Sequence, residues 1–123
     1  MESLDLSIIS ESDNINENFL LSYDESRKEK IVIDLNEVYP ISLIGINKLK
    51  FLFVKARNFD FLEGQELEND LAEFSIFIDN NPIQVCKGFF ITTFDTNTSI
   101  NSIEIQNQSP VKIKLEFLIL GEI

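Results

Sequence analysis

The stretch VKIKLEF, residues 111–117, decides the fold. Apolar and polar residues alternate strictly along it, which is the pattern of a β-strand with one buried face and one face in solvent. The stretch SIEIQ at 102–106 alternates in the same way, and NQSP at 107–110 supplies turn residues between the two. We therefore predict that these two stretches form a β-hairpin, with the last strand in the interior of a sheet.

A second hairpin is predicted upstream, where FSIFI (74–78) and IQVC (83–86) flank the turn residues DNNP (79–82). Further strands are predicted at 19–23, 31–35, 48–56 and 88–94, with 4–8 as a possible first strand and 41–46 as either a strand or an extended cover. The segment 24–30 is interpreted as a charged turn, and 58–73 as an irregular acidic segment. About eight short strands with turn signals at intervals of roughly 8–12 residues are typical of a β-sandwich or barrel.

The predicted fold is all-β: one antiparallel, jelly-roll-like β-sandwich domain that spans residues 1–123. In a sandwich, the inward side chains of two sheets interdigitate to form the core. The predicted core residues are Ile31, Ile33, Phe51, Phe53, Phe74, Ile76, Ile78, Ile103, Ile105, Val111, Ile113, Leu115 and Phe117.

Charge and composition limit the partners of the protein. The chain has 21 acidic and ten basic residues, a formal net charge of −11. Nucleic acids are bound by neutralising their phosphates with Lys and Arg, and anionic membranes repel an acidic chain, so we expect neither partner. The start of the chain lacks the basic and apolar regions of a signal peptide, and no stretch approaches the roughly 18 apolar residues of a membrane span. We therefore expect synthesis in the cytoplasm.

The inventory of reactive side chains argues against catalysis. The chain has no histidine, which removes Ser-His-Asp and Cys-His catalysis, and it has neither a GxGxxG nor a P-loop motif. Cys86 is the single cysteine, and we interpret it as a small buried hydrophobe. We expect no enzyme activity and no cofactor.

Calcium and sugars are the ligands to weigh. The acidic segment Asp60–Glu73 lacks the ligand order of an EF-hand, and we interpret it as a solvated loop. Asp95, Asn97 and Ser99 occupy alternate positions in a second loop, which we interpret as a hairpin tip. The chain has no Trp and only two Tyr to form an aromatic sugar platform. We therefore predict no metal site, and sugar binding has no support.

Surplus apolar surface is the one positive indication of function. The stretches FLFV (51–54) and FLIL (117–120) are apolar on both faces, so one face can fill the core while the other forms an exposed patch, unless 58–73 covers it. Such patches usually mark interfaces. The predicted interface residues are Leu52, Val54, Leu118 and Leu120. Because copies of charge −11 repel one another, we expect this contact to strengthen as salt screens the charge.

Five stretches follow one another between Ile46 and Glu122: LFVK (52–55), the strand pair around DNNP (79–82), GFF (88–90), IEIQNQS (103–109) and the closing LGE (120–122). This order resembles a group of small phage and prophage virion proteins of β-sandwich type, such as capsid decoration and head-fibre base proteins. The resemblance implies self-assembly, commonly as a trimer or larger ring, and docking onto a protein shell. It brings no catalytic residues.

We therefore expect a non-enzymatic virion structural protein, either a capsid decoration protein or another head or tail accessory component. Its expected partners are further copies of itself and other virion proteins such as a major capsid protein, and its expected location is the virion. A sugar- or calcium-binding β-sandwich module stays open as the alternative. A small hydrolase that uses two carboxylates is the least favoured interpretation.

Overall fold

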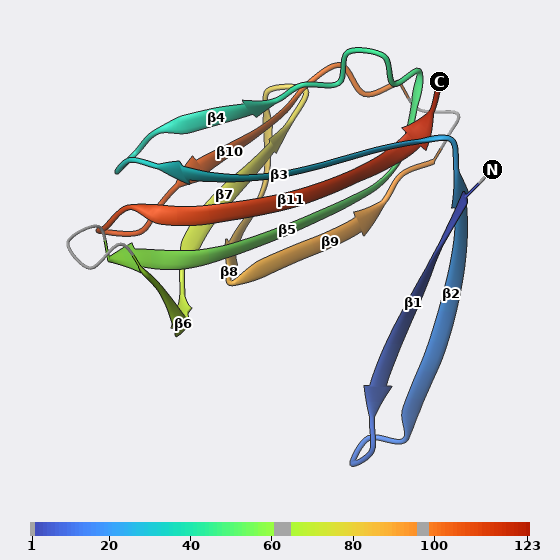
Figure 1. Ribbon diagram of the computed structural model, residues 1–123, viewed down its shortest axis with the longest axis horizontal. Helices are drawn as coiled ribbons and strands as arrows, with labels where there is room; N and C mark the ends of the chain where they lie inside the picture. Colours follow the sequence, from blue (N-terminus) through green and yellow to red (C-terminus); the bar gives the residue numbers. More distant parts are fainter. Residues whose placement is uncertain (1, 61–64, 96–98) are drawn as a thin grey trace.

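The computed structural model describes residues 2–60, 65–95 and 99–123 (Figure 1). All regular structure in these ranges is antiparallel β-strand, which confirms the predicted all-β class. The described residues contain no helix that could span a membrane. The eleven strands, more than the sequence predicted, are β1 (Glu2–Ser10), β2 (Ile15–Tyr23), β3 (Glu25–Ile33), β4 (Val38–Ile41), β5 (Lys48–Asp60), β6 (Gln65–Leu71), β7 (Glu73–Ile78), β8 (Asn81–Lys87), β9 (Phe89–Thr93), β10 (Ile103–Asn107) and β11 (Ile113–Glu122).

The larger sheet has five strands, with β11 between β3 and β5 and with both β6 and β9 on the far side of β5 (Figure 1). β9 pairs with residues 51–55 of β5, and β6 pairs with residues 57–60. The last strand therefore lies in the interior of a sheet, as predicted. Nine consecutive register pairs join β11 to β3, so β11 is bonded along nearly its whole length.

The charged segment 24–30 is not the solvated turn that the sequence predicted. Residues 25–30 form the first part of β3 and pair with β11. Side chains alternate along a strand, so Arg27 and Glu29 lie on the side of the smaller sheet, whereas Lys28 and Lys30 lie on the opposite side. The pairing satisfies the backbone of a segment whose composition alone is typical of a loop.

The smaller sheet has the order β4–β10–β7–β8. The predicted hairpin of 74–78 and 83–86 is confirmed as β7 and β8. Asp79 and Asn80 connect these strands with φ values of 50° and 66°. Two consecutive residues with positive φ match the turn whose twist suits a tight hairpin, and Asp and Asn tolerate this backbone conformation better than most residues.

The predicted hairpin of 102–106 and 111–117 is wrong, because β10 and β11 belong to different sheets. β10 pairs with β4 and β7, whereas β11 pairs with β3 and β5. The connection 108–112 thus carries the chain from one sheet to the other. Val111 lies in this connection and is 42% exposed, so its assignment to the core is also wrong.

The two sheets bury one apolar core between them. Eight predicted core residues are confirmed as buried members of it: Ile33, Phe74, Ile76, Ile103, Ile105, Ile113, Leu115 and Phe117. Ile31 and Ile78 pack against this core while partly buried. The strict alternation of β10 and β11 therefore identified their inward faces correctly.

The sequence prediction chose the wrong face of β5 as the one that turns toward the core. Leu52 lies opposite Ile119 and Val54 lies opposite Phe117 in the register, and all four side chains belong to the core. Phe51 and Phe53 were predicted in the core, but alternation places them on the other face of the sheet, where Phe51 is buried, as predicted, and Phe53 is partly buried. Since FLFV is apolar at every position, its pattern carries no information about which face turns inward.

A bulge interrupts the regular pairing of β5 with β11. The register shifts between Leu120 and Gly121, so Gly121 lies opposite Leu49. A Cβ atom at Gly121 would lie 2.5 Å from the carbonyl oxygen of Lys48 and 2.7 Å from Cγ2 of Ile46. Only glycine fits this close backbone approach.

Polar contacts join β3 to the edge of the smaller sheet. The Arg27 guanidinium donates hydrogen bonds to the carbonyl oxygens of Ser42, at 2.6 Å, and Ile44. The Tyr39 hydroxyl donates to the Glu29 carboxylate at 2.8 Å. This hydrogen bond, together with burial and the negative charge, raises the pKa of Tyr39. These contacts close one long edge of the sandwich.

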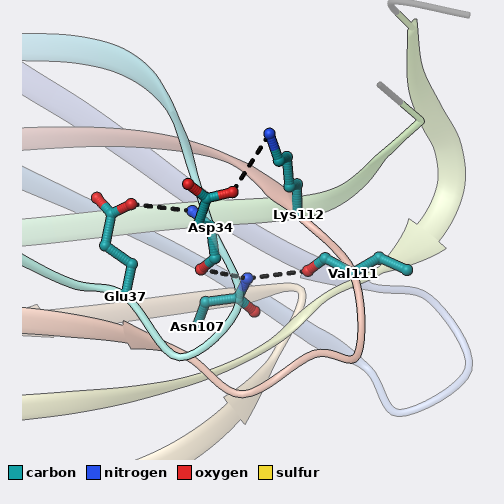
Figure 2. Close-up of polar contacts among 5 residues, drawn as sticks. All are labelled: Asp34, Glu37, Asn107, Val111 and Lys112. Carbon is teal, nitrogen blue, oxygen red and sulfur yellow. Dashed lines mark hydrogen bonds and ion pairs between the residues drawn. The ribbon is translucent and has the colours of Figure 1, made fainter. Parts of the chain in front are cut away.

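Asn107 joins two connections at one end of the sandwich, the β3–β4 turn and the β10–β11 crossing (Figure 2). Its side chain is fully buried, and Nδ2 donates to the carbonyl oxygens of Asp34, at 3.0 Å, and Val111, at 2.9 Å. Its Oδ1 accepts a hydrogen bond from the backbone N–H of Ser109 at 2.8 Å. On the surface beside this amide, Lys112 and Asp34 form an ion pair, with 3.2 Å between Nζ and Oδ1. Every partner of the amide is backbone, so the cluster fixes the crossing between the sheets.

We predict that Phe74→Ala lowers the free energy of unfolding by about 3–5 kcal/mol, because it removes a fully buried ring. The matched control is Phe89→Ala, since Phe89 is 60% exposed, and it should cost less than about 1 kcal/mol. Urea denaturation measures both. Equal losses in the two variants would contradict the position of the core.

We predict that Asn107→Ala costs about 2–4 kcal/mol, because buried backbone groups of Asp34, Ser109 and Val111 lose their partner. Asn101→Ala removes the same atoms from an exposed position and should change stability by less than about 0.5 kcal/mol. Thermal and urea unfolding compare the two. An Asn107→Ala variant as stable as Asn101→Ala would show that the cluster does not hold the crossing.

Candidate functional site

The structure separates the four predicted interface residues into two pairs. Leu52 and Val54 are fully buried in the core between the sheets. They therefore lie on no exposed patch, and the prediction that they form one is wrong. Leu118 and Leu120 lie on the opposite side of the larger sheet, on the face that turns away from the smaller sheet. We call this face the outer face.

The outer face is made by β3, β11, β5 and β9, whose outward residues align in four cross-strand rows. The first row is Val32, Lys114 and Arg57; the second is Lys30, Glu116, Lys55 and Phe89; the third is Lys28, Leu118, Phe53 and Ile91; the fourth is Ser26, Leu120, Phe51 and Thr93. The first two rows are mainly cationic, and the last two are mainly apolar. One end of the outer face is therefore charged, and the other end is apolar.

Phe51 and Leu120, the two middle residues of the fourth row, are covered although they lie outside the core, whereas Ser26 and Thr93 at its ends are exposed. Phe51 is 3% exposed and Leu120 is 1% exposed, yet neither belongs to the core cluster between the sheets. The prediction that Leu120 lies on an exposed patch is therefore also wrong. Phe51 lines a groove together with residues of the β1–β2 hairpin. The base of this hairpin therefore covers the apolar end of the outer face.

The hairpin of β1 and β2, residues 2–23, forms a two-stranded sheet of its own and projects from one corner of the sandwich (Figure 1). We call it the arm. Its register pairs Leu4 with Leu21 and Leu6 with Phe19, so these four side chains share one face of the arm with Ile8. The opposite face alternates through mostly polar residues. The arm is thus an amphipathic hairpin.

Two polar contacts attach the base of the arm to the larger sheet. The backbone N–H of Asp24 donates to the carbonyl oxygen of Gly121 at 2.9 Å, and the Lys50 ammonium donates to the carbonyl oxygen of Ser22 at 2.8 Å. Lys50 also forms an ion pair with Glu122, with 2.9 Å between Nζ and Oε1. The hydrogen bond and charge of Lys50 lower the pKa of Glu122.

An apolar groove of about 490 Å³ opens between the arm and the sheet. Leu4, Leu6 and Leu21 line one wall, and Phe51 and Ile91 lie in the other. Exposure rises away from the base, because Leu4 and Leu6 are partly buried while Phe19 and Ile8 are 51% and 50% exposed. The arm therefore presents more apolar surface than its own sheet covers.

Charge is divided unequally between the arm and the outer face. The arm carries five acids and no Lys or Arg: Glu2, Asp5, Glu11, Asp13 and Glu17. The four rows carry five of the ten basic residues of the chain, Lys28, Lys30, Lys55, Arg57 and Lys114, and Glu116 is the one acid among their residues. The arm thus has a charge of −5 and the four rows a charge of +4, within a chain of −11.

The side chains considered for chemistry do not gather into a site. Cys86 is buried, as predicted, and burial raises the pKa of its thiol. Within the described ranges, no group of three or more Cys, Asp or Glu side chains is placed to hold a metal. Residues 61–64 and 96–98, parts of the two segments weighed for calcium, lie outside the described residues. The arm and the outer face are therefore the candidate functional site.

Sequence reasoning missed most of this site. It placed strands at 4–8 and 19–23 but did not pair them, although both alternate with apolar residues at every second position. That shared period is the signal from which an amphipathic hairpin could have been predicted. The basic row residues Lys28 and Lys30 were hidden because the segment 24–30 was interpreted as a turn.

Comparison with known proteins assigns no family to the chain: no protein-family model and no curated protein matches it. The fold and the candidate site therefore carry the functional argument.

Proposed function

We propose that this protein is a non-enzymatic structural subunit that works by binding other protein chains through the outer face of its larger sheet. The single observation that carries this proposal is the apolar surface shared by the arm and the outer face. Apolar surface concentrated in one region of a protein usually marks an interaction site. Here the surface is also rimmed by charge, as is usual around the centre of a protein interface.

The setting that we propose is a bacteriophage-type virion, in which the protein is a capsid decoration protein or another head or tail accessory component. The order of elements between Ile46 and Glu122 supports this setting. A jelly-roll connection of the strands, a homo-oligomer such as a trimer, and docking onto a shell of major capsid protein belong to the same proposal. A projecting arm beside a rigid sandwich suits such a role, because it can reach a neighbouring subunit without disturbing the core.

The alternatives have no observation in their favour. A calcium-binding module needs several oxygen ligands around one ion, and the described acids form no such group. A sugar-binding module or a small hydrolase needs a polar cleft, whereas the groove beside the arm is lined almost entirely by apolar side chains.

We predict that the wild-type protein sediments as an oligomer at high micromolar concentration and that Leu118→Glu weakens this association by at least about 2 kcal/mol, or roughly 30-fold in Kd. Leu118 is at the centre of the third row, where a partner would bury the new carboxylate. Analytical ultracentrifugation measures both proteins.

The matched control is Val85→Glu, which places the same charge at an exposed apolar position on β8, in the smaller sheet. It should associate like the wild type. A wild-type protein that stays monomeric and a Leu118→Glu variant that associates as tightly as Val85→Glu would each count against the outer face as the binding surface.

A further inference from the structure

We infer that the partner at the outer face is the arm of a second copy of this chain, which lies with its apolar face on the third row and its acidic tip over the basic rows. This inference deepens the proposed function and rests on it, because it names the occupant of the same surface. It takes residues 2–23 of one copy as the ligand and the outer face of the other copy as the receptor.

Charge complementarity is the first reason to choose the arm as the occupant. An acidic chain should present acidic surface to its copies, yet its outer face has five cations around Glu116. The arm is the complementary segment, since it has five acids and no cation. Lys30 and Glu116 already form a pair at 4.0 Å, which is long, and the Lys30 side chain is 57% exposed and accessible to a further acid.

The order of side chains along the two surfaces is the second reason. From base to tip, the arm passes from Leu4 and Leu6 through Ile8 to Glu17 and the tip acid Glu11. From the fourth row to the first, the outer face passes from apolar to cationic residues. An arm laid along the face can therefore satisfy both parts at once, with apolar side chains on Leu118, Phe53 and Ile91 and acids beside the lysines.

The dimensions allow this arrangement. Nine residues of an antiparallel strand extend about 30 Å, and four rows spaced two residues apart span about 20 Å. The arm of the same chain cannot cover this length, because it leaves the sandwich at a corner and projects away from the sheet (Figure 1). Its base covers Phe51 and Leu120 of the fourth row and faces Ile91, at one edge of the third row, across the groove, so the rest of the first three rows is open to the arm of a neighbour.

A second copy explains both surplus surfaces with one contact. The exposed apolar part of the arm, with Ile8 and Phe19, needs a receptor, and the third row needs a ligand. Two copies that exchange arms satisfy both needs, and reciprocal contacts between identical surfaces are typical of symmetric dimers. Continued exchange around a ring would extend the same contact to a trimer.

This arrangement changes the expected effect of salt. The sequence predicts that association strengthens with salt because whole chains of charge −11 repel one another. In the arm exchange, opposite charges meet at the contact, while distant like charges are already screened beyond about 8 Å at physiological ionic strength. Added salt above that level should therefore weaken the contact.

A charge-exchange experiment tests the inference. The arm-reversed chain carries Glu11→Lys and Glu17→Lys, and the face-reversed chain carries Lys28→Glu and Lys30→Glu. The control chain carries Lys48→Glu and Lys87→Glu, which lie outside the four rows. Each Lys→Glu change shifts the charge by two units, so the control and face-reversed chains both go from −11 to −15. Circular dichroism confirms that each chain is folded, and sedimentation velocity gives its mass.

We expect the wild-type and control chains to associate, and each reversed chain alone to be at least tenfold weaker in association. An equimolar mixture of the two reversed chains should recover the wild-type mass, because both contacts are then complementary: the basic arm of the arm-reversed chain meets the acidic face of the face-reversed chain, and the acidic arm of the face-reversed chain meets the basic face of the arm-reversed chain. Recovery in the mixture cannot come from damage to either fold. If the face-reversed chain is unfolded, Lys28→Ser with Lys30→Ser replaces it and should still weaken association.

Reversed chains that associate like the wild type, or a mixture that recovers nothing, would overturn the arm exchange. The proposed function would survive that result if Leu118→Glu still separates the wild-type oligomer, since another partner surface could then occupy the outer face. A monomeric wild-type protein would overturn both.

Discussion

The pairing of β11 with β3 and β5 is the constraint on which the rest of the structure depends. Its inward residues Ile113, Leu115, Phe117 and Ile119 fill the centre of the core, while Leu118 and Leu120 on its other side support the outer face. The same strand provides the carbonyl of Gly121 that receives the base of the arm. Core, outer face and arm attachment therefore share one element, and a change in the register of β11 would move all three.

The sequence was sufficient for the class of fold and for part of the topology. Alternation in β10 and β11 identified their buried faces, and the Asp79–Asn80 turn identified the β7–β8 hairpin. It was insufficient to predict the topology where two strands that are consecutive in the sequence belong to different sheets. Residues 107–112 contain turn signals that fit a hairpin equally well, but the side chain of Asn107 binds the β3–β4 turn and carries the chain into the other sheet. Such a long-range partner leaves no local signal.

The candidate site was only half predictable for a related reason. A stretch that is apolar on both faces, such as 51–54, reveals surplus apolar surface but not its direction, so Leu52 and Val54 were placed outside while Phe51 and Phe53 were placed inside. The basic outer face was hidden in the charged segment 24–30, because only pairing with β11 sorts Lys28 and Lys30 to one side and Arg27 and Glu29 to the other. The strongly negative net charge of the chain also gave no indication that the outer face contains a positively charged region.

In the arm exchange that we propose, the sandwich supports two complementary surfaces, an acidic amphipathic arm and an outer face with apolar and basic rows. A nuclear Overhauser measurement on oligomer assembled from equal amounts of isotope-labelled and unlabelled chains tests this most directly. Filtering for contacts between the two kinds of chain should give signals from the Phe19 ring of one copy to the methyl groups of Leu118 and Ile91 of another. An oligomer in which Phe19 shows contacts only within its own chain would contradict the account.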